Sequence, residues 1–394
     1  MFKHLFKLMW NKRRQNFLLL SEILISFMVI FALFSFLVYY YQNYNKPLGL
    51  EHNSVWTVSY DNRQVSKNVD SARLFYDNLD RALRAMPQIK TVSYTSGNFP
   101  FSQSVMNTNL TLNDRVIYSV NRYVTGQDYH KVLNLKILEG RWFKPADAAS
   151  TVKPIVINAS LKAEAFGRQS AVGKYLNNKE KENRLKVVGV VQDVKASGDY
   201  LPAGKAMYTR MDTTDIKWNG HILIKVNDAA DANFEGKLYK FLGRSFNNER
   251  VEITYMDDLR DAKNEITVIP MIIFMIVAGF LIINVALGLF GVLWYNISRR
   301  RSEIGLRRAI GASGTSVSSQ LVAESLILAT LSIIVGCFFA LQFPLLNVFD
   351  VAADIYLYAI VLSMLFIYLL VIACSVYPGR QAAAIHPASA LHEE

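Results

Sequence analysis

The chain has 394 residues, 52% of them hydrophobic, and the apolar residues are concentrated in a few long stretches. Its formal charge of +11 would suit a nucleic-acid-binding protein, but basic residues beside apolar stretches are better explained as signals of membrane orientation, so we expect no nucleic-acid partner. The two cysteines, Cys337 and Cys374, fall inside apolar stretches, which excludes disulfides, thiol-bound zinc and thiol catalysis from the large polar segment.

Four apolar stretches are long enough to cross a membrane. A spanning helix needs roughly 20 consecutive apolar residues to cross about 30 Å of hydrocarbon, because its backbone groups find no water there. The sequence therefore predicts membrane helices over 17–41, 266–297, 317–346 and 355–377. The first stretch is long and ends in three tyrosines, which is typical of a retained anchor and not of a cleaved signal peptide.

Lysine and arginine predict how these helices are oriented. Basic residues are concentrated before the first span, in 1–16, and in the connection 298–316, whereas the connection 347–354 contains Asp350 and Asp354 but no basic residue. Because positively charged connections stay in the cytoplasm, both termini, including the tail 378–394, are expected there. The segment 42–265 is then extracytoplasmic.

Taken in chain order, the first element is an amphipathic helix over 1–16. Phe2, Leu5, Phe6 and Met9 recur at helical spacing with lysines between them, as in helices that lie on the inner leaflet of a membrane. A plain extension of the first span is the alternative.

The segment 42–265 alternates strand-like and helix-like stretches. Its runs of Val, Ile, Thr and Tyr predict strands over 54–60, 89–94, 115–124, 154–158, 185–194, 221–226 and 251–255. A helix is expected over 71–86, capped by Ser71 and stopped by Pro87, and another over 232–246. The segment is long enough for a core of its own, so we predict an extracytoplasmic α+β domain of two lobes.

The second span is expected to begin outside the membrane. Residues 257–265 are charged yet contain no Gly or Pro, which predicts a helical stalk that continues into the span. Pro270 either kinks this helix or lies near its start, and the sequence leaves both open. Further along, Gly279, Asn284, Gly288 and Gly291 form a small-residue face that favours packing against another helix, with lipid contact as the alternative.

Two acids lie within the predicted spans, Glu22 in the first and Glu324 in the third. Ionisable groups at the centre of a bilayer cost about 2.5 to 3.5 kcal/mol on insertion scales and are often functional. Both acids lie near the cytoplasmic boundary, where that cost falls. Hydrogen bonding between helices and an ion or proton pathway are therefore both open.

No stretch of the sequence carries a recognisable catalytic motif. Gly167 and Gly173 approximate a phosphate-binding loop, but five residues separate them where the motif has four, and Tyr175 replaces its Ser or Thr. The six histidines form no i, i+4 metal pair. We expect no enzyme activity, no catalytic residue, no cofactor and no metal in this chain.

Two runs flanking the last two spans carry a family resemblance. Residues 299–313, RRRSEIGLRRAIGAS, resemble the signature that follows the second span of FtsX-like, MacB-type ABC transporter permeases, and residues 377–391, YPGRQAAAIHPASAL, resemble their ending. Residues 128–143 are similar to the MacB-type periplasmic core domain, as are shorter stretches at 156–158, 165–167, 171–174 and 188–193. The resemblance covers nearly the whole chain.

The resemblance implies a multi-pass permease of the cell inner membrane with a periplasmic domain. It implies a dimer with a second copy or a paralogue, coupled to cytoplasmic ABC ATPase subunits that bind ATP and Mg. Long first and second helices would carry movement outward, which is mechanotransmission. Unlike the fused exporters, this sequence shows no ATPase domain, so ATP hydrolysis is expected in a partner.

The resemblance leaves the substrate open. Efflux with a periplasmic adaptor and an outer-membrane channel is the leading hypothesis. Regulation of cell-envelope hydrolases and lipoprotein release are alternatives within the family. A membrane-anchored sensor or scaffold is the alternative of another class.

The connection 298–316 has the properties of a coupling element. It is short, it is prone to form a helix over 302–310, and Gly311 is placed to end that helix, so it would move as a rigid lever. Its arginines could face acidic groups of an ATPase or lipid phosphates. The residues hypothesised to couple to the ATPase are Arg301, Glu303, Ile304, Gly305, Arg307, Arg308 and Gly311.

Overall fold

The protein is described by a computed structural model over residues 13–61, 68–177, 183–212, 220–247 and 250–383. It divides into two compact units. We call residues 43–267 the sheet unit, and residues 1–42 with 268–394 the helical unit. The predicted amphipathic helix lies outside the described residues up to position 12, and the tail lies outside them from position 384.

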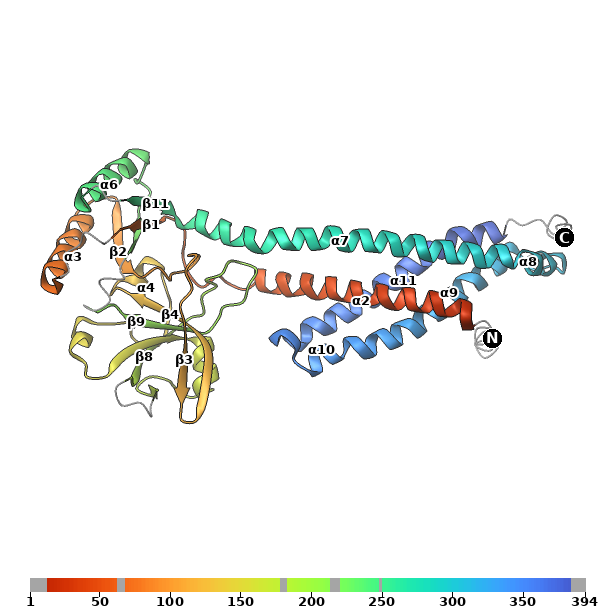
Figure 1. Cartoon of the computed structure of the whole chain (residues 1–394), viewed down its shortest axis with the longest axis horizontal. Helices are drawn as coiled ribbons and strands as arrows, with labels where there is room; N and C mark the ends of the chain where they lie inside the picture. Colours follow the sequence, from red (N-terminus) through yellow and green to blue (C-terminus); the bar gives the residue numbers. More distant parts are fainter. Residues whose placement is uncertain (1–12, 62–67, 178–182, 213–219, 248–249, 384–394) are drawn as a thin grey trace. The chain divides into compact units, whose positions relative to one another are not determined.

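Four long helices dominate the helical unit, and two of them continue into the sheet unit (Figure 1). Within the described residues, four helices are long and apolar enough to cross a membrane, which confirms the four predicted spans. They are α2 (Arg13–Tyr44), α7 (Met256–Arg299), α9 (Gly314–Ala340) and α11 (Ala353–Ala383).

The last two spans differ from the prediction in detail. The third candidate span, Gly314–Leu345, ends within one residue of the predicted 346, but it is interrupted: α9 ends at Ala340, α10 (Gln342–Leu345) follows, and then the 3-10 turn η3 (Val348–Asp350). Pro344 lacks a backbone N–H, so an α-helix through it would lose one of its hydrogen bonds. In contrast, α11 runs through Pro378 into the predicted tail.

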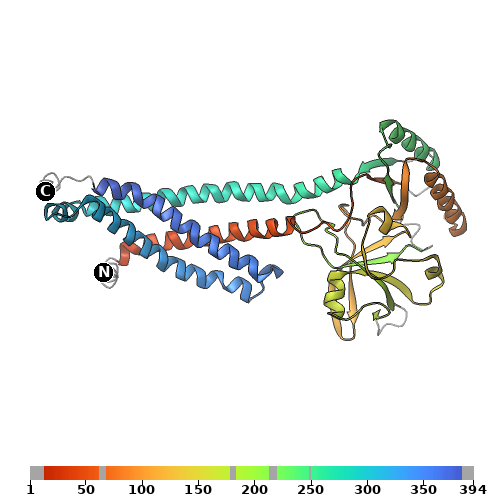
Figure 2. The ribbon, with the colours of Figure 1, turned by 180° about the vertical axis from the view of Figure 1, so that it is seen from behind.

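Three helices share the core of the helical unit. Buried side chains of α2, α9 and α11 form one apolar cluster, and α9 and α11 lie side by side in both views (Figures 1 and 2). The close approach of α2 to α9 depends on Gly336, because a Cβ there would lie 2.5 Å from the Phe27 ring. Small residues therefore set the helix spacing here.

The helix α7 contributes little to that core. Leu289 is its fully buried member of the cluster, whereas many of its large apolar side chains are exposed, among them Ile269, Ile273, Ile276, Phe280, Ile283 and Leu287. Such a helix suits lipid or another membrane helix. It is continuous from Met256, so residues 257–265 are helical as predicted, while their role as a stalk outside the membrane stays a prediction; Pro270 lies inside the helix, away from its start.

The sheet unit is built on one mixed sheet. Its described strands are β1 (Val55–Tyr60), β2 (Ile89–Thr95), β3 (Asn107–Leu112), β4 (Arg115–Thr125), β5 (Ile137–Gly140), β6 (Lys153–Asn158), β7 (Tyr175–Leu176), β8 (Leu185–Val191), β9 (Ala206–Arg210), β10 (His221–Val226) and β11 (Val251–Tyr255). The main order is β11-β1-β10-β2-β4-β9-β6-β8-β5, with β3 on β4 and β7 on β8. All seven predicted strands are present, with ends shifted by up to three residues.

The sheet has a narrow waist between β2 and β4. These strands pair only at Thr95 and Thr125, whereas β4 and β9 pair in parallel over five residues. On one side of the waist the strands are antiparallel, and on the other they are mixed. The architecture is α+β as predicted, and the division into two lobes stays a prediction.

Helices cover the sheet locally. The helices α3 (Val69–Arg84) and α6 (Ala232–Ser245) share one apolar cluster with β1, β2 and β10 and lie at the same end of the sheet unit (Figure 1). The predicted cap of α3 was wrong, because Asn68, and not Ser71, accepts the free N–H groups, those of Asp70 and Ser71. Shorter helices are α4 (Tyr129–Val132), α5 (Ala159–Phe166) and the 3-10 helix η1 (Pro145–Ala149).

The packing of α3 gives a direct test of this arrangement. Leu83 is fully buried under α3, whereas Leu74 of the same helix is exposed. We expect Leu83→Ala to lower the unfolding free energy of the sheet unit by about 2–5 kcal/mol, through lost burial and a residual cavity. Leu74→Ala should change it by less than about 0.5 kcal/mol. Hydrogen exchange of β2 and β10 in the detergent-solubilised chain measures the unfolding free energy of each variant. Equal exchange in the two variants would contradict the packing of α3.

Candidate functional site

The connection between α7 and α9 contains a short helix with a defined end. This helix, α8 (Arg301–Ala309), is followed by Ile310 as its C-cap. Gly311 has a φ of 103°, a conformation that side chains disfavour, and its N–H donates to the carbonyl of Arg308 at 3.1 Å. The helix expected over 302–310 is thus present within one residue at each end, and Gly311 directly follows its C-cap.

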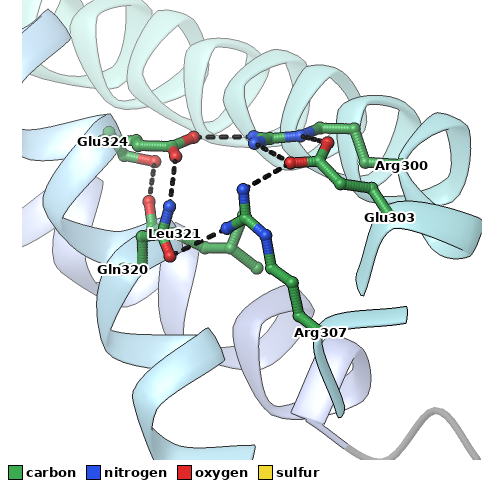
Figure 3. A network of polar contacts seen from close by, with 7 residues as sticks. Arg300, Glu303, Arg307, Gln320, Leu321 and Glu324 are labelled. Carbon is green, nitrogen blue, oxygen red and sulfur yellow. Dashed lines mark hydrogen bonds and ion pairs between the residues drawn. The ribbon is translucent and has the colours of Figure 1, made fainter. Parts of the chain in front are cut away.

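A chain of charged contacts fastens α8 to α9 (Figure 3). Arg300 donates to Glu324 Oε2 at 2.8 Å and to Glu303 Oε2 at 3.0 Å. Arg307 donates to Glu303 Oε1 at 2.6 Å and to Gln320 Oε1 at 3.0 Å. Gln320 in turn donates to Glu324 Oε1 at 3.2 Å, which closes the ring of contacts.

The central pair of this network is largely shielded from water. The Arg300 and Glu324 side chains are 17% and 19% exposed. Burial alone would lower the pKa of Arg300, but its hydrogen bonds to Glu303 and Glu324 raise the pKa above the ordinary value. Partly buried charges of this kind are tolerated when each has several hydrogen-bond partners, so the network holds α8 in one orientation.

The apolar residues of α8 fall on two different surfaces. Ile304 is buried against Val317 of α9, with Ile297, Ala312 and Leu321 around them. Leu306 and Ile310, in contrast, are exposed. One surface of this helical segment therefore packs on α9, and another presents the aliphatic side chains of Leu306 and Ile310 outwards.

The residues hypothesised to couple to an ATPase divide between these surfaces. Glu303 and Arg307 belong to the network, Ile304 and Gly305 are buried, Arg308 is half-buried, and Arg301 and Gly311 are exposed. The coupling role of each stays a prediction. Sequence reasoning missed Arg300 and Gln320 as members of the site. The i, i+4 spacing of Gln320 and Glu324, beside a connection rich in arginine, was the signal available.

The other intramembrane acid, Glu22, lies against α7. A Cβ on Gly288 would stand 1.8 Å from Glu22 Oε1, so only glycine permits this approach. Of the remaining small-residue positions, Gly279 and Gly291 have no described atom within 4 Å of a Cβ, and Asn284 donates to Phe280 of its own helix at 2.7 Å. Packing of this face against a second copy stays a prediction.

Metal ligands do not gather in the described part of the chain. No group of three or more His, Cys, Asp and Glu side chains in those residues has the arrangement of a metal site. In the segment that approximates a phosphate-binding loop, Lys174 donates to Gln169 at 2.5 Å, and Tyr175 stacks beneath Arg184.

Comparison with known proteins identifies the family. Residues 17–236, more than half of the chain, match the MacB-like periplasmic core domain, and residues 275–387 match the FtsX-like permease C-terminal domain. This chain belongs to the MacB/FtsX-type ABC transporter permeases. It is an integral membrane protein with an extracytoplasmic domain, and that domain is the sheet unit.

Curated relatives of this MacB/FtsX-type permease include fused exporters. It is 24% identical over 271 residues to the macrolide export ATP-binding/permease protein MacB of Bdellovibrio bacteriovorus, covering 65% of this chain and 41% of the relative. It is 25% identical over 281 residues to the protein of the same name from Bartonella quintana, covering 68% and 42%. The permease thus spans about two fifths of the length of these relatives.

Solved structures similar to the permease are of extracytoplasmic regions. The periplasmic region of MacB from Actinobacillus actinomycetemcomitans matches with 18% identity and a TM-score of 0.39, covering 54% of this chain and 94% of that one. The extracellular domain of the noncanonic ABC-type transporter YknZ from Gram-positive bacteria matches with 14% identity and a TM-score of 0.36, covering 51% and 99%.

The pair of Arg300 and Glu324 predicts a coupled effect on α8. We expect Glu324→Gln to lower the free energy of opening of α8 by about 1.5–3 kcal/mol, since a hydrogen bond between charged groups is lost. Arg300→Gln should have a similar effect. The double variant should be less destabilised than the sum of the two, because the residues interact directly.

Hydrogen exchange of residues 301–309 measures this coupling. Strictly additive effects would mean that the pair contributes nothing to holding α8. Loss of transport in Glu324→Gln with α8 still protected from exchange would instead favour the ion or proton pathway.

Proposed function

We propose that this chain is the permease subunit of an ABC transporter and converts ATP hydrolysis by a separate cytoplasmic ATPase into movement of its periplasmic domain. The observation that carries this proposal is the construction of α8. The helix is held to α9 by Arg300 and Glu324, while Leu306 and Ile310 remain exposed. A rigidly attached helix with an exposed aliphatic surface suits docking into an apolar cleft of a partner.

The path of force follows from the helices themselves. The helix α8 begins two residues after the end of α7, and α7 is 44 residues long. At about 1.5 Å per residue this is about 66 Å of helix, against about 30 Å of hydrocarbon. The same helix therefore extends from the connection that carries α8 to Met256, directly after β11. Displacement of α8 by an ATPase would reach the sheet unit without an intervening flexible linker.

Other parts of the proposal concern partners and location. ATP and Mg would bind to the ATPase, with no cofactor in this chain. The second copy or paralogue would pack on the exposed surface of α7. The protein would lie in the cell inner membrane with both termini in the cytoplasm, as the basic residues of 298–316 favour. Export of a periplasmic substrate, with an adaptor and an outer-membrane channel, is supported by the export function in the names of the curated relatives.

The topology can be tested with reporter fusions. Alkaline phosphatase fused after Ser150 should be active, and the same enzyme fused after Ser313 should be inactive, because it folds only outside the cytoplasm. A fluorescent protein that matures only in the cytoplasm serves as the reciprocal control. The opposite pattern at Ser150 would overturn the orientation of the sheet unit.

The ATPase proposal is tested by co-purification. We expect the chain isolated in mild detergent to carry an ATP-binding subunit, identified by mass spectrometry, and vanadate-sensitive ATP hydrolysis. Ile310→Asp should reduce the amount of that subunit at least about tenfold, since a charge in an apolar contact costs more than about 1.4 kcal/mol. Phe349→Asp, at an exposed apolar position of the opposite connection, is the matched control. An isolate with neither subunit nor hydrolysis would favour the sensor or scaffold.

A further inference from the structure

The connection from β8 to β9 contacts the last residues of α2 and the first turns of α7. We call its residues 192–200 the clamp loop. The helix α2 ends at Tyr44 and α7 begins at Met256, so the outer ends of both helices belong to the sheet unit. Two charged residues of the clamp loop, Lys195 and Asp199, are 3% and 7% exposed. Burial of charges to this degree requires that each has close polar partners.

Lys195 binds the end of α2. Its Nζ donates to the carbonyl oxygen of Asn43 at 2.6 Å and to that of Asp199 at 2.8 Å. The Asn43 carbonyl is among the last four of α2, which the helix cannot pair internally, and a cation at a helix C-terminus is favoured by the helix dipole. Beside it, the rings of Tyr44 and Tyr200 stack at 5.4 Å.

Asp199 binds the start of α7. Its carboxylate accepts from Arg260 Nη2 at 2.7 Å, from Arg260 Nε at 3.1 Å and from Asn264 Nδ2 at 2.8 Å. Its backbone N–H donates to Asn264 Oδ1 at 2.8 Å. Arg260 and Asn264 are one helical turn apart, so the same acid is held at two points of one face of α7. Burial would raise the pKa of Asp199, but the bonds from Arg260 and Asn264 lower it, which keeps the carboxylate ionised.

The backbone of the clamp loop is shaped for this contact. Gly198 has a φ of 105°, and a Cβ there would lie 2.6 Å from Asn264 Oδ1. The Lys195 N–H donates to the Leu48 carbonyl at 2.9 Å, which ties the loop to the segment after α2. The clamp loop therefore contacts both α2 and α7, and a residue other than glycine at 198 would separate the loop from α7.

We propose that Lys195 and Asp199 are positioning residues of a clamp that fixes the outer ends of α2 and α7 to each other and to the sheet unit. The clamp rests on the proposed function for its use: force that arrives along α7 would be passed to α2 and to the sheet. Buried ion pairs add little net stability but define one geometry, which is what transmission of movement requires. The clamp loop would thus be the rigid connection between α2, α7 and the sheet.

The clamp itself is tested in the purified full chain without nucleotide. Lys195→Met and Asp199→Asn should each accelerate hydrogen exchange of residues 42–48 and 257–264 at least about tenfold, because bonds to charged groups are lost. Lys240→Met and Asp261→Asn are the controls, since both side chains are exposed and make no described contact with the clamp loop. Unchanged exchange in the first two variants would overturn the clamp, whatever the role of the ATPase.

Transmission is tested in the complex with its ATPase. Hydrogen exchange of the sheet unit is compared between the nucleotide-free and the ATP–vanadate states. In Asp199→Asn, ATP hydrolysis should stay within about twofold of the wild type while the exchange difference is lost, which a merely structural role would not produce. A retained exchange difference would overturn the positioning role. A wild-type complex without any difference would contradict the proposed function, and the nucleotide-free comparison would still decide the clamp.

A reversible bond gives a second test of positioning. In a chain whose Cys337 and Cys374 are replaced by Ser, Asp199→Cys with Asn264→Cys places two thiols where the clamp loop meets α7. We expect the ATP-dependent exchange difference to be present in the oxidised protein and absent in the reduced protein. Loss of the difference in both redox states, with the disulfide verified by mass spectrometry, would contradict the clamp as the transmitting element.

Discussion

Backbone hydrogen bonding inside the bilayer is the constraint on which the rest of this structure depends. Because hydrocarbon offers no partner to a free N–H or carbonyl group, the four apolar segments cross as helices. Movement transmitted from one side of the membrane to the other must therefore be carried by a helix. The helix α7 combines both environments in one element: charged residues such as Arg260 at one end, and an apolar surface with exposed Ile269 and Phe280 further along. Its polar ends and apolar middle are consequences of this single requirement.

Both places where α7 changes environment use the same chemistry. At one end Asp199 of a loop receives Arg260, and beyond the other end Arg300 reaches Glu324 of a neighbouring helix. In each case the guanidinium group supplies several donors in a fixed plane, which lysine does not. The two pairs are more than thirty residues apart along the chain and belong to different units, yet each converts a helix end into a rigid attachment.

The spans and the end of α8 could be predicted from the sequence because they depend on local composition and on one glycine, Gly311. The strands rich in Val and Ile were equally visible. In contrast, β3 reads NTNLTL, in which two asparagines disfavour a strand, and it is a strand that pairs with β4. The partners of Lys195 could not be inferred either, since its contact with Asn43 joins residues far apart in sequence. Side-chain pairs of this kind depend on the assembled fold.

The pairing of β1 has a consequence for how the protein is made. This strand directly follows α2, but its two neighbours in the sheet are β10 and β11, with Trp56 opposite Ile224 on one side and Tyr255 on the other. During synthesis β1 leaves the ribosome long before either partner exists. Therefore β1 does not have both of its strand partners until the chain has been synthesised up to Tyr255, directly before α7. This half of the sheet can be completed only when synthesis has reached the second membrane helix.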